Sequence, residues 1–93
     1  MEEKKQKVRS IYDTSCIAYL FSKNVELATP ACLDSAGKVV FLFPDTEEVN
    51  RQISEFYNKT GTVVAIRYAE NLRLVRALIS STKTDRERGG ASR

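Results

Sequence analysis

Cys16 and Cys32 are the side chains whose types could support covalent or metal chemistry in this 93-residue chain. The chain contains no histidine, which excludes Ser-His and Cys-His catalysis and every histidine-dependent metal site. Cys16 follows a run of helix-capping residues, 13–15, and a helix N-terminus would lower the pKa of its thiol. The thiol has no histidine to accept its proton, and the spacing of the two cysteines is not a C-x-x-C motif.

The two cysteines are better explained as small, buried apolar residues of a protein from a reducing compartment. The alternative is a single Cys16–Cys32 disulfide in an oxidising compartment. The charged N-terminus lacks the apolar segment of a signal peptide. The longest apolar run, residues 39–43, is far shorter than the roughly 20 residues of a membrane helix. We therefore expect a soluble, cytoplasmic protein with reduced thiols.

The carboxylates between the charged chain ends occupy positions that indicate structural roles. Asp13 and Asp45 precede helical patterns as caps, and Asp34 belongs to a turn. Glu47 and Glu48 fall in the first turn of a helix, where the helix dipole favours negative charge. No pair remains at a spacing suited to acid–base catalysis. The sequence therefore predicts a protein that is not an enzyme, with no metal, no cofactor and no small-molecule substrate.

The net charge of +3 belongs to the chain ends rather than to the folded part. Residues 1–9 and residues 83–93 each carry +2, whereas the segment between them carries −1. On the last predicted helix, Arg73, Arg76 and Lys83 lie within about 80° of one another. Arg86 and Arg88 continue this basic stripe into the C-terminal tail. Weak, sequence-nonspecific nucleic-acid binding is therefore one prediction, and a solvated helix face with cations near its C-terminus is the alternative.

The elements that would position these residues begin with a short strand at 8–12 and a helix that starts at the caps 13–15. Apolar residues cover about half of this helix, and Asn24 suits the left-handed conformation that ends it. Residues 25–33 alternate as a strand, which Pro30 breaks or places at an edge. Residues 38–43 are apolar enough for a central strand covered on both faces, so the two segments predict a β-hairpin.

The second half of the chain predicts an amphipathic surface helix at 46–58, capped by Asp45 with Glu48 at the capping-box position. A short apolar strand at 62–66 follows. A helix at 68–81 then carries an apolar stripe at helical spacing. The two strands that flank helix 46–58 would form a right-handed β-α-β crossover.

The expected fold class is α+β, with a small mixed β-sheet in the order β-α-β-β-α-β-α and helices packed on it. Residues 8–82 form the single domain. A flexible basic tail at 1–7 and a disordered basic tail at 83–93 flank it, because both are rich in charge and nearly free of apolar residues.

Leu74 and Leu78 widen the apolar arc of the last helix beyond what a small core is expected to cover. The strand at 39–43 is also apolar on both faces. An uncovered apolar face would be an interface, most simply that of a homodimer. The alternative is a small core that covers these residues by itself. We expect a non-enzymatic binding or regulatory module that contacts a protein partner or a second copy of itself, in preference to nucleic acid.

Several segments together resemble a family of short domains of unknown function from bacteria and phages. They are D-T-S-C-I-A-Y-L-F-S-K-N at 13–24, G-K-V-V-F-L-F at 37–43, P-D-T-E-E-V at 44–49 and E-F-Y-N at 55–58. The resemblance covers residues 13–80. Members of that family favour glycine after the first helix, where this chain has Asn24, which fits the same conformation. The resemblance implies no activity, and it favours an accessory protein of a phage or mobile element.

Overall fold

The sheet is built around the apolar strand near the middle of the chain. The computed structural model describes residues 7–91, and the side chains of residues 7–84. Strand β3(Val39–Pro44) lies between β1(Val8–Ile11) and β2(Cys32–Leu33), and both pair with it in antiparallel orientation. Phe41 and Phe43 are fully buried, which confirms the predicted central strand. Most of the predicted tail at 1–7 lies outside the described residues.

Two predicted strands differ in the structure. The alternating segment 25–33 forms only the two residues of β2, because Asn24 turns the chain and the backbone then crosses the core as an irregular loop. The segment 62–66 is not a strand, so the crossover does not form and the sheet is antiparallel rather than mixed. β1 and β2 already occupy both edges of β3. The fold class α+β is confirmed, with three helices in the order β-α-β-β-α-α.

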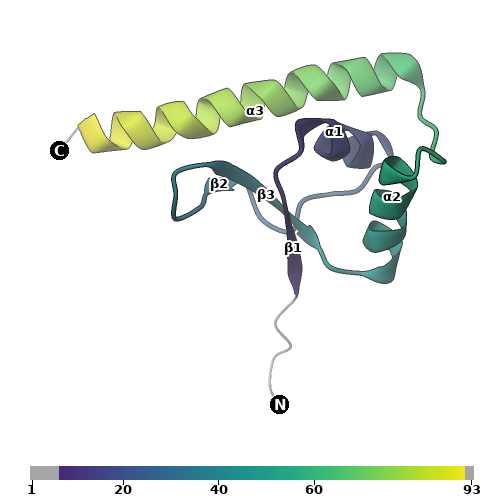
Figure 1. The fold of residues 1–93 in the computed structure, drawn as a ribbon. Helices are drawn as coiled ribbons and strands as arrows, with labels where there is room; N and C mark the ends of the chain where they lie inside the picture. The colour runs from purple at the N-terminus through teal and green to yellow at the C-terminus, as the bar shows by residue number, and fades with distance from the viewer. Residues whose placement is uncertain (1–6, 92–93) are drawn as a thin grey trace.

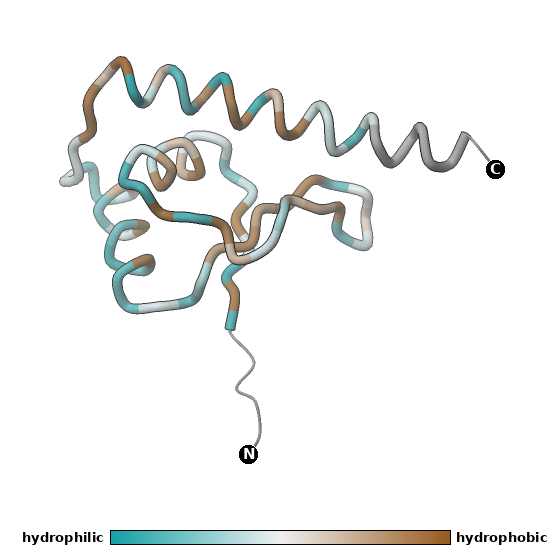
Figure 2. Tube along the Cα trace, turned by 180° about the vertical axis from the view of Figure 1, so that it is seen from behind, coloured by the Kyte–Doolittle hydropathy of each residue, from teal (hydrophilic) through white to brown (hydrophobic). Residues whose placement is uncertain are grey.

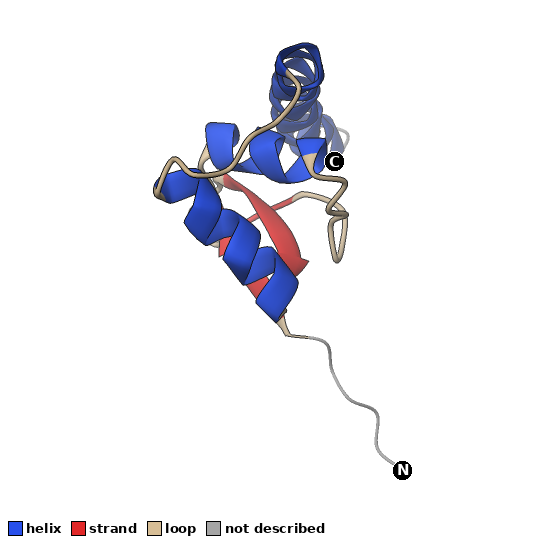
Figure 3. Ribbon diagram, turned by 90° about the vertical axis from the view of Figure 1, so that its right-hand side faces the viewer, coloured by secondary structure: helices blue, strands red, loops and turns tan. Residues whose placement is uncertain are grey.

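Helix α1(Thr14–Ser22) is the most buried helix, as its pattern predicts. The carboxylate of Asp13 caps it by accepting hydrogen bonds from the backbone N–H groups of Ser15 and Cys16, at 3.0 and 3.4 Å. Asn24 has φ of 66°, which confirms the left-handed residue expected after this helix. Figure 3 shows α1 between α3 on one side and α2 with the sheet on the other.

The N-cap of helix α2(Glu47–Tyr57) lies one residue later than predicted. The hydroxyl of Thr46, not the carboxylate of Asp45, accepts the hydrogen bond from the backbone N–H of Val49. Asp45 accepts instead from the amide of Asn50. Glu48 consequently forms no capping box, and its carboxylate pairs with Arg51 along the same helix.

Helix α3(Ala65–Ala91) spans 27 residues and crosses the top of the molecule in Figure 1. At about 1.5 Å per residue it is roughly 40 Å long, far longer than the predicted helix 68–81. It packs mainly on α1 and also contacts β2 and β3. The backbone of residues 83–91 continues this helix, in a stretch where the sequence predicts a disordered tail. None of the described helices is long and apolar enough to cross a membrane.

The core lies where α1, β3, α2 and the middle of α3 meet. Its fully buried members are Cys16, Ile17, Ala18, Leu20, Phe41, Phe43 and Val75. Figure 2 shows that the chain is hydrophobic at the bend leading into α3, which is the segment predicted as a strand. There Val64 and Ile66 are 67% and 71% exposed, whereas Val63 packs against the core. This segment therefore contributes Val63 to the core but does not join the sheet.

Candidate functional site

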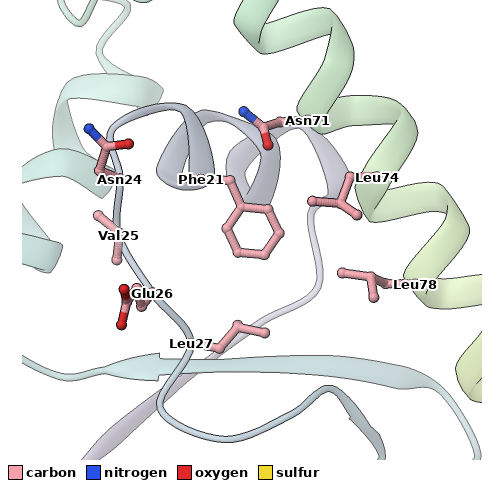
Figure 4. A pocket seen from close by; sticks show the side chains of 8 residues that line it. All are labelled: Phe21, Asn24, Val25, Glu26, Leu27, Asn71, Leu74 and Leu78. Carbon is pink, nitrogen blue, oxygen red and sulfur yellow. The ribbon is translucent and has the colours of Figure 1, made fainter.

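An open groove of about 400 Å³ runs between one flank of α3 and the loop that follows α1. Figure 4 shows Phe21 at its centre, with residues of α3 on one side and the loop 24–27 on the other. Eight residues from three parts of the chain line the groove: Phe21, Asn24, Val25, Glu26, Leu27, Asn71, Leu74 and Leu78. The wall is thus mainly apolar, and Glu26 carries its single charge.

The rotation of α3 about its axis places Leu74 and Leu78 in this groove. Val75 is completely buried against the core, so Leu74, one residue earlier, points about 100° away from that contact. Leu74 is 46% exposed, and Leu78, one turn later on the same flank, is half-buried. The structure therefore brings both predicted interface residues to one apolar surface, which the domain leaves partly open.

Hydrogen bonds between α3 and α1 join the two helices beside the groove, near the lining residue Asn71. The side-chain amide of Asn71 donates to the hydroxyl of Ser22 at 3.2 Å, and Arg67 donates to the carbonyl of Ser22 at 3.4 Å. Ser22 is itself buried, and its hydroxyl donates to the carbonyl of Ala18 at 2.8 Å. These contacts anchor the first turns of α3 on α1, and the position of the groove follows from them.

The loop wall was missed by sequence reasoning. Val25 and Leu27 belong to the segment predicted as a strand, and Phe21 lies in the helix predicted before it. The left-handed conformation of Asn24 and the hydrogen bond from the backbone N–H of Val25 to the carbonyl of Leu20, at 3.0 Å, direct the loop beneath α3. Asn24 was the available signal, because a helix that ends there must change direction.

The predicted basic residues lie on a different part of α3. Arg73, Arg76 and Lys83 are all exposed. At 100° per residue, Arg76 and Lys83 fall on the flank of α3 opposite Leu74, and Arg73 faces outward between the two flanks. The side chains of Arg86 and Arg88 lie outside the described residues. The groove and the basic residues are therefore two separate surfaces of one helix.

The surroundings of Cys16 do not activate its thiol. Burial raises the pKa of the Cys16 thiol to about 11, which is the opposite of the direction expected at a helix N-terminus. Cys16 lines a small cavity of about 140 Å³ together with Tyr57. The hydroxyl of Tyr57 donates to the carboxylate of Asp13 at 2.9 Å. Burial, and next this hydrogen bond, raise the pKa of Tyr57. Both groups therefore carry their protons at neutral pH.

Cys32 differs from its prediction. It lies on the short edge strand β2 and is exposed, whereas Cys16 is buried, and both are free thiols. In the part of the chain that the structure describes, no three His, Cys, Asp or Glu residues come close enough together to hold a metal ion. The disulfide alternative does not apply to this structure.

The comparisons with known proteins identify a family. A family model described as "Domain of unknown function (DUF5659)" matches residues 6–81, most of the chain. The match ends within α3 and includes every residue that lines the groove. No curated protein and no solved structure matches the chain.

Proposed function

We propose that this chain, which belongs to the DUF5659 family of domains of unknown function, is a non-enzymatic module that binds a protein partner through the groove between α3 and loop 24–27. The exposure of Leu74 carries the proposal. A large apolar side chain left 46% exposed beside Phe21, Val25 and Leu27 forms a continuous apolar surface rather than an isolated exposed residue.

The shape of the groove favours a protein segment over a small molecule. Small-molecule sites cover most of their ligand and combine apolar walls with several convergent polar groups. This groove is open to solvent, and its charged lining is limited to Glu26. Apolar side chains of a partner would fill it as anchors, with Asn24, Glu26 and Asn71 at its polar rim.

Two features support a regulatory rather than a catalytic role, in the cytoplasm. The buried Cys16 thiol holds its proton, and the chain has no histidine to act as a base near neutral pH. The exposed free thiol of Cys32 suits a reducing compartment, where it remains unpaired. We therefore propose a cytoplasmic binding protein whose partner is a second copy of the chain or another protein.

Light scattering over a range of concentrations tests whether the chain forms a dimer. Selection from a displayed peptide library tests whether the groove binds a segment of another protein. Selected peptides are mapped by NMR on the full chain. Leu74→Glu removes the apolar contact and adds a charge, whereas Ala77→Glu adds the same charge on the outward face of α3. We expect loss of the dimer or of peptide binding with Leu74→Glu alone. A monomer whose selected peptides map away from Phe21 and Leu74 overturns the proposal.

A further inference from the structure

The flank of α3 opposite the groove carries a concentration of positive charge that extends beyond the helix itself. Arg73, Arg76 and Lys83 lie away from the groove, whereas Arg67 lies on the groove flank and donates to Ser22. With Arg67 and the single acid Glu70 included, the segment of α3 whose side chains are described, residues 65–84, carries a net charge of +3. The rest of the described chain, residues 7–64, carries a net charge of −1. Charge is therefore separated between the helix and the body of the domain.

The structure adds a fourth cation that the sequence pattern did not indicate. Lys38, in the turn of the β2–β3 hairpin, lines the same hollow as Lys83 and Ile79 of α3. This hollow has a volume of about 230 Å³, and both lysines are exposed. The hairpin turn and the basic flank of α3 thus meet at one site, although they are 45 residues apart in the sequence.

Asp34, the acid at the start of the hairpin turn that carries Lys38, is already occupied by other contacts. The carboxylate of Asp34 accepts hydrogen bonds from the backbone N–H groups of Ala36 and Lys38, both at 2.9 Å. It also accepts from the hydroxyl of Tyr12 at 2.8 Å. Among the described side chains, no carboxylate forms an ion pair with Arg73, Arg76 or Lys38. The positive charge of this surface is therefore turned toward solvent.

From this placement we propose that Arg73, Arg76 and Lys83 of α3, together with Lys38 of the hairpin turn, bind the phosphate backbone of double-stranded DNA. The three cations of α3 are distributed over about 15 Å of the helix axis. Phosphate contacts from such a row hold a duplex in place without reading its bases. The proposal concerns a second surface and stands independently of the groove.

The composition of the surface favours a duplex over single strands and over membranes. Single-strand binding relies on aromatic side chains on which bases stack. Tyr12 is the aromatic residue of the hollow, and its ring faces the Lys38 ammonium at 5.8 Å while its hydroxyl binds Asp34. A membrane surface would need large apolar side chains between the cations. Ala77 and Ser80 occupy those places on α3.

Fluorescence anisotropy of a short labelled DNA duplex tests the proposal with the full chain. Four phosphate contacts give a slope of log affinity against log salt of about −3 to −4, so affinity falls roughly 60- to 250-fold between 50 and 200 mM salt. Arg73→Gln with Arg76→Gln should weaken binding at least about tenfold at low salt and reduce the slope by about 2. Lys38→Gln alone should reduce the slope by about 1.

The matched control is Arg51→Gln with Lys59→Gln, which removes the same charge from α2 and the residues after it. This control should retain the affinity for the duplex and the salt slope, because it lowers the net charge without removing a phosphate contact. An equal loss of duplex affinity in the control and in Arg73→Gln with Arg76→Gln overturns the proposal. It is also overturned if Arg86→Gln with Arg88→Gln abolishes binding while Arg73→Gln with Arg76→Gln does not. Binding to anionic phosphatidylserine vesicles but not to the duplex overturns it as well.

Discussion

Gly61 passes so closely over the ring of Tyr19 that a side chain at residue 61 has no room. A Cβ at residue 61 would lie 2.7 Å from Cζ of Tyr19 and closer still to its hydroxyl oxygen. The ring cannot easily move away, because it packs against Phe56 with centroids 5.4 Å apart and carries the Lys23 ammonium 5.7 Å from its centroid. This contact fixes the path by which the chain leaves α2 and reaches α3.

Gly61→Ala should therefore destabilise the protein by about 1–3 kcal/mol, the usual cost of forcing an extra methyl into a packed site. The φ of Gly61 is not positive, so its backbone conformation suits alanine. Without the clash with Tyr19, Gly61→Ala would therefore stabilise the protein slightly. Urea denaturation measures the difference. Adding Tyr19→Phe, which removes the hydroxyl, should recover part of the loss. A neutral or stabilising Gly61→Ala would show that the chain does not pass over Tyr19 in this way.

Phe41→Ala should cost about 3–5 kcal/mol, because Phe41 is 1% exposed at the centre of β3 and the substitution leaves a cavity. That is a large share of the stability of a domain of this size. Val64→Ala is the comparison, since Val64 is 67% exposed and its loss should change the free energy of unfolding by less than about 0.5 kcal/mol. Equal effects in thermal or urea denaturation would contradict the central position of β3.

The elements predicted correctly are those whose signals are local. Asp13 and Asn24 mark the two ends of α1 through backbone geometry that depends on a few neighbouring residues, and both positions were predicted. The segment 62–66 has the composition of a strand, but a strand needs an unpaired neighbour. β1 and β2 occupy both edges of β3, and the segment pairs with the outer edge of neither, which no local pattern reveals.

The candidate surfaces were predicted in part for the same reason. The helical spacing of 3.6 residues per turn was sufficient to place Leu74 and Leu78 on one flank of α3 and Arg76 on another. The opposite wall of the groove comes from a loop, and Lys38 comes from a turn, so their positions depend on how distant segments pack. The two thiols also differ: Cys16 is buried, as its helical pattern predicts, whereas Cys32 is exposed on the edge strand β2.

The two thiols should react at very different rates with an aromatic disulfide reagent under native conditions. Cys32 is exposed and should react quickly, whereas Cys16 is buried and its raised pKa leaves almost no thiolate at neutral pH. Cys32→Ser should therefore remove the fast phase, and denaturant should release one slow thiol. Two fast thiols in the native protein would contradict the packing of α1.

Alkaline pH should destabilise the protein through Cys16. The thiol pKa rises from an ordinary value of 9.0 to about 11 on folding, so the folded state holds this proton more tightly than the unfolded chain. The resulting stabilisation is complete below about pH 9 and is lost as the pH rises toward 11, at no more than about 1.4 kcal/mol per pH unit. Urea denaturation at several pH values measures the slope, which Cys16→Ala should reduce and Cys32→Ser should not.

Adjacent residues of α3 should differ sharply in their contribution to stability. Val75 is fully buried, so Val75→Ala should cost about 1–3 kcal/mol, whereas Leu74→Ala should cost less than about 1 kcal/mol although it removes more atoms. The groove and the basic flank both depend on this rotation of α3, since Leu74 and Arg76 flank the buried position on either side. If Leu74→Ala proved the more costly change in urea denaturation, α3 would be rotated by about 100°. Leu74 would then lie in the core, and neither the apolar groove nor the basic flank would face solvent as described.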